Sequence, residues 1–203
     1  MNNIGRNLTG RFLFFLRFLV FGASPLFLQA SALTDANKTI TTASPTSLKS
    51  KIENSLEKGC NFLLETQNDD GSWGSARKTK GLNIFAPVPG SHRAFRLAVT
   101  ALSMSALLEI KSEDANYSRC IEKGQNYLLE KLPQLRRASP MALYNVWSHC
   151  YGIQALHRMH EKSSSKKQRK KIQDVMSQQI KMLQTYESID GGWGYYDFNA
   201  QTK

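Results

Sequence analysis

Cysteine is scarce in this chain of 203 residues, which has three: Cys60, Cys120 and Cys150. So few and so widely spaced cysteines exclude a scaffold held together by many disulfides, and they exclude the paired cysteines of a structural zinc site. Each cysteine lies among apolar residues at helical spacing, so we expect buried free thiols. If the protein is exported, one disulfide is possible and one thiol is left over.

Histidine is also scarce, since the chain has only four. His157 and His160 are one helical turn apart, so the pair could supply two ligands to a metal ion. His149 would lie about 16 Å from His160 along the helix axis and cannot complete that site. Two histidines without a third ligand predict a polar helix edge, and we expect neither a metal nor a cofactor.

Apolar runs long enough to span a membrane are absent after residue 32, and the single run before it is short. The chain begins with Arg6 and Arg11, continues with an apolar stretch over 12–28, and then reaches the small-residue pattern 30–32. A basic start, an apolar middle and an A-x-A end predict a secretory signal peptide over 1–32.

Arg17 and Pro25 interrupt the apolar stretch, so an uncleaved membrane anchor and a misassigned start are alternatives to the signal peptide. Cleavage would start the mature protein near Leu33 and leave no stable membrane span. We therefore expect a protein that is secreted or held in the cell envelope or periplasm. N-terminal sequencing of exported material checks this expectation, which a start at Met1 would contradict.

Acidic residues are outnumbered, and the formal net charge is +11. Five basic residues form the run 166–171. Such a run could bind nucleic acid or anionic lipid, but no aromatic side chain is interleaved with it for base stacking. We expect a solvated loop that leads into a helix, and no nucleic-acid partner.

What the chain does contain is an internal repeat, which follows a Thr-, Ser- and Ala-rich segment over 33–47 that we expect to be a flexible linker. The segment 58–65 recurs 65 residues later at 123–130, and the segment 70–74 recurs 120 residues later at 190–194. A one-sided apolar stripe recurs at the same two offsets. Its residues are Ile52, Leu56, Phe62 and Leu63, then Tyr117, Ile121, Tyr127 and Leu128, then Ile172, Met176, Met182 and Leu183.

Two segments between the copies, 94–110 and 141–159, are apolar almost all the way round. They predict helices that are covered on most sides, whereas the striped segments predict helices buried on one side only. The result is an all-α fold in which outer and inner helices alternate, and no segment is typical of a β-strand. The predicted helices are 48–67, 93–111, 115–131, 141–161 and 168–187.

The repeat residues follow one pattern: a basic and a small residue, an aromatic–aliphatic pair, then Gln, Gly and Trp. The second copy departs from it at Leu132–Pro133, and the third has Glu187 in place of Gln. The matching residues are Lys58, Gly59, Phe62, Leu63, Gln67, Gly71 and Trp73, then Lys123, Gly124, Tyr127 and Leu128, then Leu183, Gly191 and Trp193.

Over residues 48–197 the chain thereby resembles the squalene cyclase and prenyltransferase repeat superfamily. The resemblance implies an α/α toroid, here an incomplete α–α barrel of outer and inner helix pairs over 48–203. It also implies that the chain is an N-terminal part of a longer member. Such a toroid would need further repeats or another chain to close.

The resemblance implies structural roles for the repeat residues. Gly71 and Gly191 allow a tight turn after an outer helix. Trp73 and Trp193 pack across that turn, and Gln67 bonds to a neighbouring helix terminus.

The residues that carry catalysis in the resembled family have no counterparts here. The sequence contains no Asp-x-Asp-Asp cluster, and the acid pair Asp69–Asp70 lies in the structural turn. The zinc ligands of the prenyltransferases cannot be matched. Glu109 is the single carboxylate in the two apolar segments, and a basic cluster at His92, Arg93 and Arg96 comes without metal-binding acids.

Tyr144, Trp147 and Tyr151 form an aromatic stripe at helical spacing, which either packs in the core or lines a cavity wall. We expect an exported binding or scaffold module for an apolar small molecule or peptide. One alternative is the N-terminal part of an isoprenoid cyclase or prenyltransferase whose catalytic residues lie outside this chain. Another is a truncated product with little function of its own.

Overall fold

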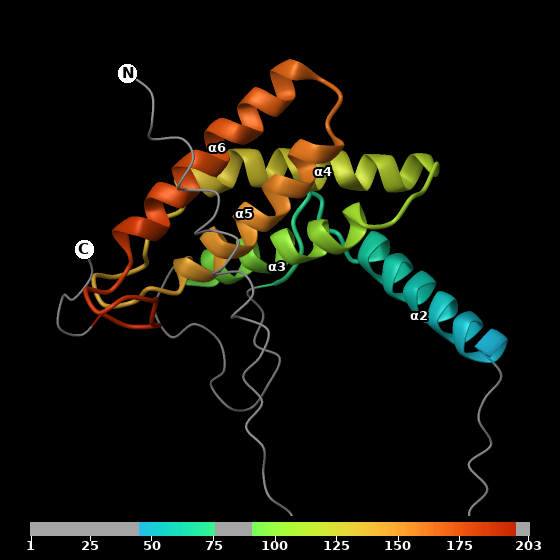
Figure 1. Ribbon diagram of the computed structural model, residues 1–203, viewed down its shortest axis with the longest axis horizontal. Coiled ribbons are helices and arrows are strands. Elements are labelled where there is room, and N and C mark those ends of the chain that lie inside the picture. Colours follow the sequence, from blue (N-terminus) through green and yellow to red (C-terminus); the bar gives the residue numbers. More distant parts are fainter. Residues whose placement is uncertain (1–44, 76–90, 198–203) are drawn as a thin grey trace, which may run out of the picture. The chain divides into compact units, whose positions relative to one another are not determined.

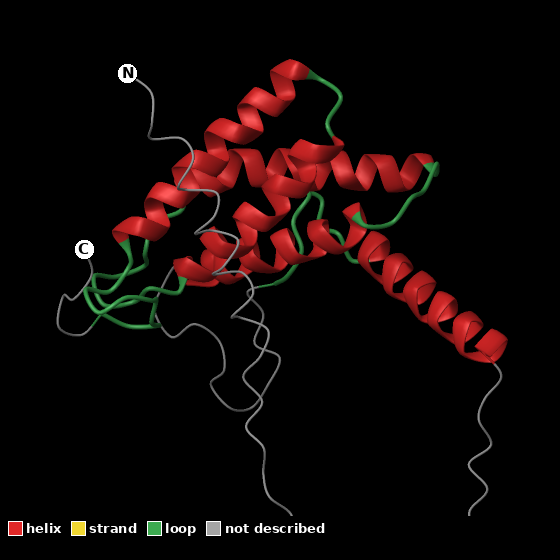
Figure 2. Cartoon of the chain, viewed as in Figure 1, coloured by secondary structure: helices red, strands yellow, loops and turns green. Residues whose placement is uncertain are grey.

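Helices and their connecting loops make up the described chain, which comprises residues 45–75 and 91–197 of a computed structural model (Figures 1 and 2). Within these ranges no β-strand forms, and the predicted all-α fold is confirmed. The predicted signal peptide over 1–32 lies outside the described residues, as does the predicted linker up to residue 44. The helices are α2 (Pro45–Glu65), α3 (Ser91–Leu108), α4 (Ala115–Lys131), α5 (Asn145–Lys162) and α6 (Lys166–Thr185), with a short 3₁₀ helix, η1 (Leu132–Gln134).

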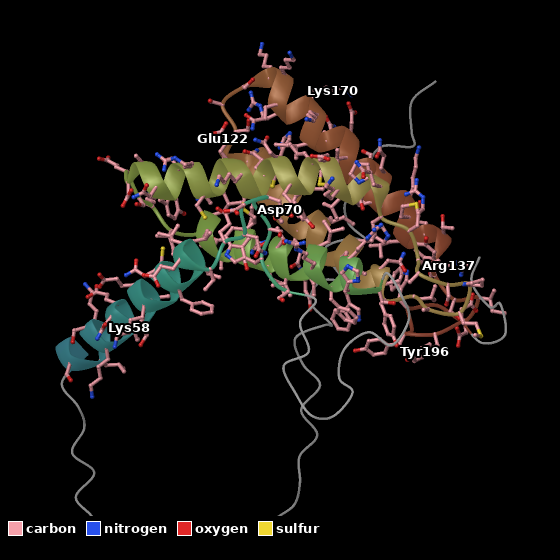
Figure 3. The ribbon with its side chains drawn as sticks, turned by 180° about the vertical axis from the view of Figure 1, so that it is seen from behind. Lys58, Asp70, Glu122, Arg137, Lys170 and Tyr196 are labelled. Carbon is pink, nitrogen blue, oxygen red and sulfur yellow. The ribbon has the colours of Figure 1, made fainter. Side chains whose placement is uncertain are left out.

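Three helices, α2, α3 and α6, begin two or three residues earlier than the sequence predicts. α2 begins at Pro45, inside the predicted linker, where a proline is well suited to the first helical position. α6 begins at Lys166 and is capped by the hydroxyl of Ser165, which accepts from the backbone N–H of Gln168 (3.4 Å). The basic run therefore lies in the first turns of α6, where Lys170 is labelled in Figure 3. Lys170 pairs with Asp174.

α5 begins later than predicted, because the residues before Asn145 bond to the segment that follows α6. The N–H of Leu143 donates to the carbonyl of Tyr195 (2.8 Å), and the N–H of Asp197 donates to that of Met141 (2.9 Å). These bonds hold 141–143 in an extended path instead of a helical one.

α3 and α5 form the most extensive helix contact in the structure. They run parallel, since Ser148 bonds to the carbonyl of Ala94 near their starts and Arg158 pairs with Glu109 near their ends. α4 packs on α3, and α6 packs on α5. The main core is one cluster of buried side chains that Trp73, α3, α4, α5 and α6 share. Its fully buried apolar side chains include Met104, Leu107, Leu128, Leu156 and Ile172.

The apolar stripe is buried in α4 and partly buried in α6, but it is exposed along most of α2. The exposed fractions of Ile52, Leu56 and Phe62 are 52%, 61% and 63%, whereas those of Tyr117 and Ile172 are 7% and 0%. We expected all three copies to bury their stripes, and for α2 this was wrong. The reason is that no inner helix precedes α2 among the described residues, so that only its last turns reach the core.

None of the helices in the described ranges is both long enough and apolar enough to cross a membrane.

Candidate functional site

The Gly–Trp segment builds the same corner after α2 and after α6. Gly71 and Gly191 both have positive φ angles, 87° and 91°. Each N–H bonds back three residues, to the carbonyl of Asn68 (2.9 Å) and of Ser188 (3.0 Å). The repeat at an offset of 120 residues is therefore present in the backbone as well as in the sequence.

The two tryptophans are held alike but covered differently. The indole N–H of Trp73 donates to the carbonyl of Leu63 (2.8 Å), and that of Trp193 donates to Leu183 (2.7 Å). Trp73 is 3% exposed, whereas Trp193 is 40% exposed. The difference arises because α3 and α4 cover the first corner, and no helix in the described part of the chain covers the second one in this way.

Gln67 joins the first corner to α4. Its side-chain amide donates to the carbonyls of Gly71 (3.1 Å) and Cys120 (2.9 Å). We expected a bond to a helix terminus, and the structure instead places the acceptor Cys120 inside α4. Arg96 also serves this corner, because it pairs with Asp70 (3.2 Å) and lies over the ring of Tyr127 (6.0 Å). The predicted basic cluster is thus partly used in bracing the fold.

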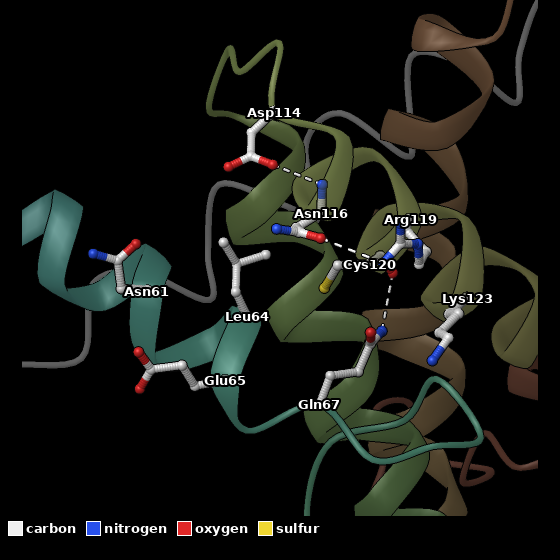
Figure 4. Close-up of a pocket in the computed structure, with 9 residues that line it drawn as sticks. All are labelled: Asn61, Leu64, Glu65, Gln67, Asp114, Asn116, Arg119, Cys120 and Lys123. Atoms are coloured by element: carbon white, nitrogen blue, oxygen red, sulfur yellow. Dashed lines mark hydrogen bonds between the residues drawn. The ribbon is translucent and has the colours of Figure 1, made fainter.

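A cavity of about 390 Å³ lies between the end of α2 and the start of α4 (Figure 4). Several of its polar groups are already engaged in local structure: Asp114 caps α4 by accepting from the N–H of Asn116 (2.7 Å), and Gln67 donates to the carbonyl of Cys120 (2.9 Å). Two acidic and two basic side chains line it, so their formal charges cancel. We therefore interpret this cavity as part of the packing between α2 and α4 and not as a binding site. Its lining residues are Asn61, Leu64, Glu65, Gln67, Asp114, Asn116, Arg119, Cys120 and Lys123.

The strongest candidate site is a surface of aromatic and aliphatic side chains that α3, α5 and the segment after α6 share. We call it the aromatic surface. On α3 three apolar side chains stand one turn apart and are between 37% and 44% exposed, although the rest of that helix is largely buried. Its members are Phe95, Val99 and Leu102 from α3, Tyr144, Trp147 and Tyr151 from the α5 region, and Tyr195 and Tyr196.

Ring contacts link the aromatic members of this surface to one another. Tyr144 is only 7% exposed and lies beneath this surface, with its ring centroid 5.4 Å from that of Phe95, 6.0 Å from that of Tyr195 and 5.5 Å from that of Tyr196. Trp147 extends it, 5.9 Å from Tyr195 and 5.6 Å from Tyr151. The structure thus brings the three predicted aromatic residues together with others that the sequence analysis did not single out.

The chemistry of the aromatic surface is that of contact rather than of proton transfer. The hydrogen bond between the hydroxyls of Tyr144 and Tyr196 raises the pKa of Tyr144 to about 12, so the phenol stays protonated. Arg137 pairs with the buried carboxylate of Asp197 (3.6 Å) and helps to fix this segment, beside Tyr196 in Figure 3. Aromatic faces held in place in this way bind apolar or cationic groups.

A buried polar cluster under α5 was missed by sequence reasoning. His149 is fully buried; its Nδ1 donates to the side-chain oxygen of Gln179 (2.7 Å), and its Nε2 accepts from Asn145 (3.2 Å). The ring stacks on Tyr186 at 5.8 Å. The sequence contains one indication of this cluster: Gln179 occupies the repeat position that is glycine in the other two copies, Gly59 and Gly124.

Burial lowers the pKa of His149, and the charge of Arg136 lowers it further, against the opposing effect of the Gln179 bond. The unfolded chain therefore takes up a proton near pH 6.5 that the folded chain does not. Stability should be full above that pH and should fall by up to about 1.4 kcal/mol per pH unit below it. Urea unfolding between pH 7.5 and 5.5 measures this slope, with exposed His157→Gln as a control variant that keeps it. An NMR titration in which His149 takes up its proton at pH 6.5 or above would contradict the prediction.

The remaining predicted residues are placed without forming a site. His157 pairs with Glu161 (3.4 Å), and the described residues contain no group of three metal-ligating side chains. The three cysteines are free thiols, with Cys120 buried and the other two half-buried.

Comparison with known proteins adds no relative: no protein-family model, no curated protein and no solved structure matches the chain.

Proposed function

We propose that this chain is an exported repeat protein that binds an apolar ligand, a small molecule or an apolar peptide, on its aromatic surface. The observation that carries the proposal is the exposed stripe on α3. A helix that buries most of its other faces nevertheless presents Phe95, Val99 and Leu102 to solvent, next to the aromatic residues of α5. Exposed apolar patches of this kind mark binding surfaces.

We further propose that the helix pairs belong to an α/α toroid of the squalene cyclase and prenyltransferase type. The repeated Gly–Trp corner and the alternation of inner helices α3 and α5 with outer helices α4 and α6 support this arrangement. In a toroid the exposed stripe of α3 would face the central cavity, where an apolar ligand is shielded from water.

Binding is favoured over catalysis by the state of Glu109. The hydrogen bond from Arg158 (2.6 Å) and the charge of that guanidinium lower the pKa of Glu109, which is itself 65% exposed. Protonating an alkene requires a carboxylic acid held in a dry pocket, and an ionised, solvated carboxylate does not meet this requirement.

Titration of the chain with farnesol and, separately, with an apolar peptide tests the proposal. Binding should shift the fluorescence of Trp147, so Trp147→Phe should lose the signal while Trp193→Phe keeps it. Leu102→Asp should weaken binding by at least about tenfold, because it places a charge in the apolar contact. Leu48→Asp, on a leucine of similar exposure in α2, is the matched control and should bind normally. If neither probe gives a signal that depends on Trp147, the proposal is wrong.

A further inference from the structure

The corner that follows each outer helix packs on the next outer helix. After α2, a methyl group on Gly71 would lie 2.3 Å from the carbonyl oxygen of Lys123. A methyl group on Gly124 would lie 3.1 Å from the ring of Trp73. After α4, η1 packs on α6 in the same order. One junction therefore joins two partners: a Gly–Trp corner and a Lys–Gly pair in the next outer helix.

α2 carries the Lys–Gly half of this junction without a corner to cover it. Lys58 and Gly59 correspond to Lys123 and Gly124, yet nothing among the described residues lies within 4 Å of a methyl group placed on Gly59. Leu56 and Phe62 flank this site and are 61% and 63% exposed. We call this face of α2 the head.

The segment after α6 carries the other half of the junction. Gly191 has the same positive φ as Gly71, but a methyl group on it would meet no atom of the described chain within 4 Å. Trp193 and the neighbouring Ile189 are 40% and 69% exposed. We call this corner, residues 188–194, the tail.

We propose that the tail of one copy of this chain docks on the head of a second copy, with Trp193 on Gly59 as Trp73 lies on Gly124. The complementary halves are present in one sequence, and the structure supplies the geometry of the completed junction. Figure 3 labels Lys58 on α2 and Tyr196, next to the tail, near opposite ends of α3. The head and the tail of one copy therefore do not meet, whereas the tail of one copy can reach the head of a second copy.

In the completed junction Asp70 pairs with Arg96 of α3 (3.2 Å), and it is the backbone carbonyl of Lys123 that lies against Gly71. The proposed docking therefore depends on the fit of Trp193 to Gly59 and not on charge. The contact is heterologous, because it joins two different surfaces, and it therefore leads to rings or open chains of copies.

Sedimentation velocity on the complete chain and two variants tests the proposal. Gly59→Leu blocks the head, and it should not disturb folding because the site is open and leucine favours helix more than glycine does. Trp193→Ala removes the anchor of the tail. The natural chain should associate as its concentration rises, and each variant alone should associate at least about tenfold more weakly. Asn126→Leu, on an exposed residue of α4, is the matched control and should associate normally.

The decisive measurement is an equimolar mixture of the two variants. Each variant keeps one intact surface, so the mixture should form one-to-one heterodimers and nothing larger. A mixture that does not recombine, or a natural chain that stays monomeric at every concentration, would overturn the proposal. Undiminished association of Trp193→Ala would also overturn it, because that outcome points to pairing of two α2 helices instead.

Discussion

Replacing Trp73 by alanine should lower the free energy of unfolding by about 3–5 kcal/mol, as expected for the loss of a fully buried tryptophan. Trp73 is 3% exposed, and its ring packs against Gly124. Its backbone N–H donates to the hydroxyl of Thr100 on the inner helix α3 (3.0 Å). A domain with about 5–15 kcal/mol of stability would be unfolded in part by this change. Urea unfolding followed by far-UV circular dichroism measures it.

Trp193→Ala is the natural control for this prediction. Trp193 makes the same indole bond to the helix before it, but it is 40% exposed, so its replacement should cost only about 1–2 kcal/mol. Because both tryptophans make this indole bond, the difference between the two losses of stability reports the burial of Trp73. If Trp73→Ala does not fold, Trp73→Phe should fold with a smaller loss. Equal losses for Trp73→Ala and Trp193→Ala would show that the first corner does not brace the helices.

The contrast between these two tryptophans also shows how far the sequence is informative. The offset of 120 residues correctly predicted that Gly71 and Gly191 begin equivalent corners, because the turn depends on local residues: a glycine with positive φ and an indole that reaches back ten residues. Helix positions were predicted well for a similar reason, since periodicity is a local property.

What the sequence could not predict depends on neighbours. The stripe of α2 shows which face this helix can bury, but not whether another helix covers it, and Leu56 and Phe62 are exposed. The bond between His149 and Gln179 joins residues 30 positions apart and follows no periodic pattern. The aromatic surface was partly predicted: Tyr144, Trp147 and Tyr151 follow helical spacing, whereas Phe95, Tyr195 and Tyr196 join them through tertiary packing alone.

The presence or absence of a neighbouring indole also explains why glycine is used at one junction and not at another. In the second copy the Gly–Trp corner is replaced by Leu132–Pro133, and the glycine of the next outer helix is replaced by Gln179. Without an indole to accommodate, that position has room for a long side chain, which reaches His149. The Gly–Trp corner and the glycine of the next outer helix are therefore lost together, as expected if the glycine makes room for the indole.

Gly71→Ala should be the most damaging of the small substitutions in this chain. Two costs add at this position. A φ of 87° strains any residue with a side chain, and the new methyl group would stand 2.3 Å from the carbonyl oxygen of Lys123. That oxygen belongs to the backbone of α4 and cannot turn aside as a flexible side chain would. Strain and overpacking together should cost at least about 3 kcal/mol.

Gly191→Ala separates the two costs. Its φ of 91° imposes the same strain, but a methyl group there meets nothing within 4 Å among the described residues, so the loss should be about 1–2 kcal/mol. Urea unfolding of both variants at one low protein concentration, where copies do not associate, measures the difference. The excess loss in Gly71→Ala is the cost of crowding α4. If the two variants lose the same stability, the corner does not lie tightly against Lys123, and the junction on which the head-to-tail contact is patterned would have to be abandoned.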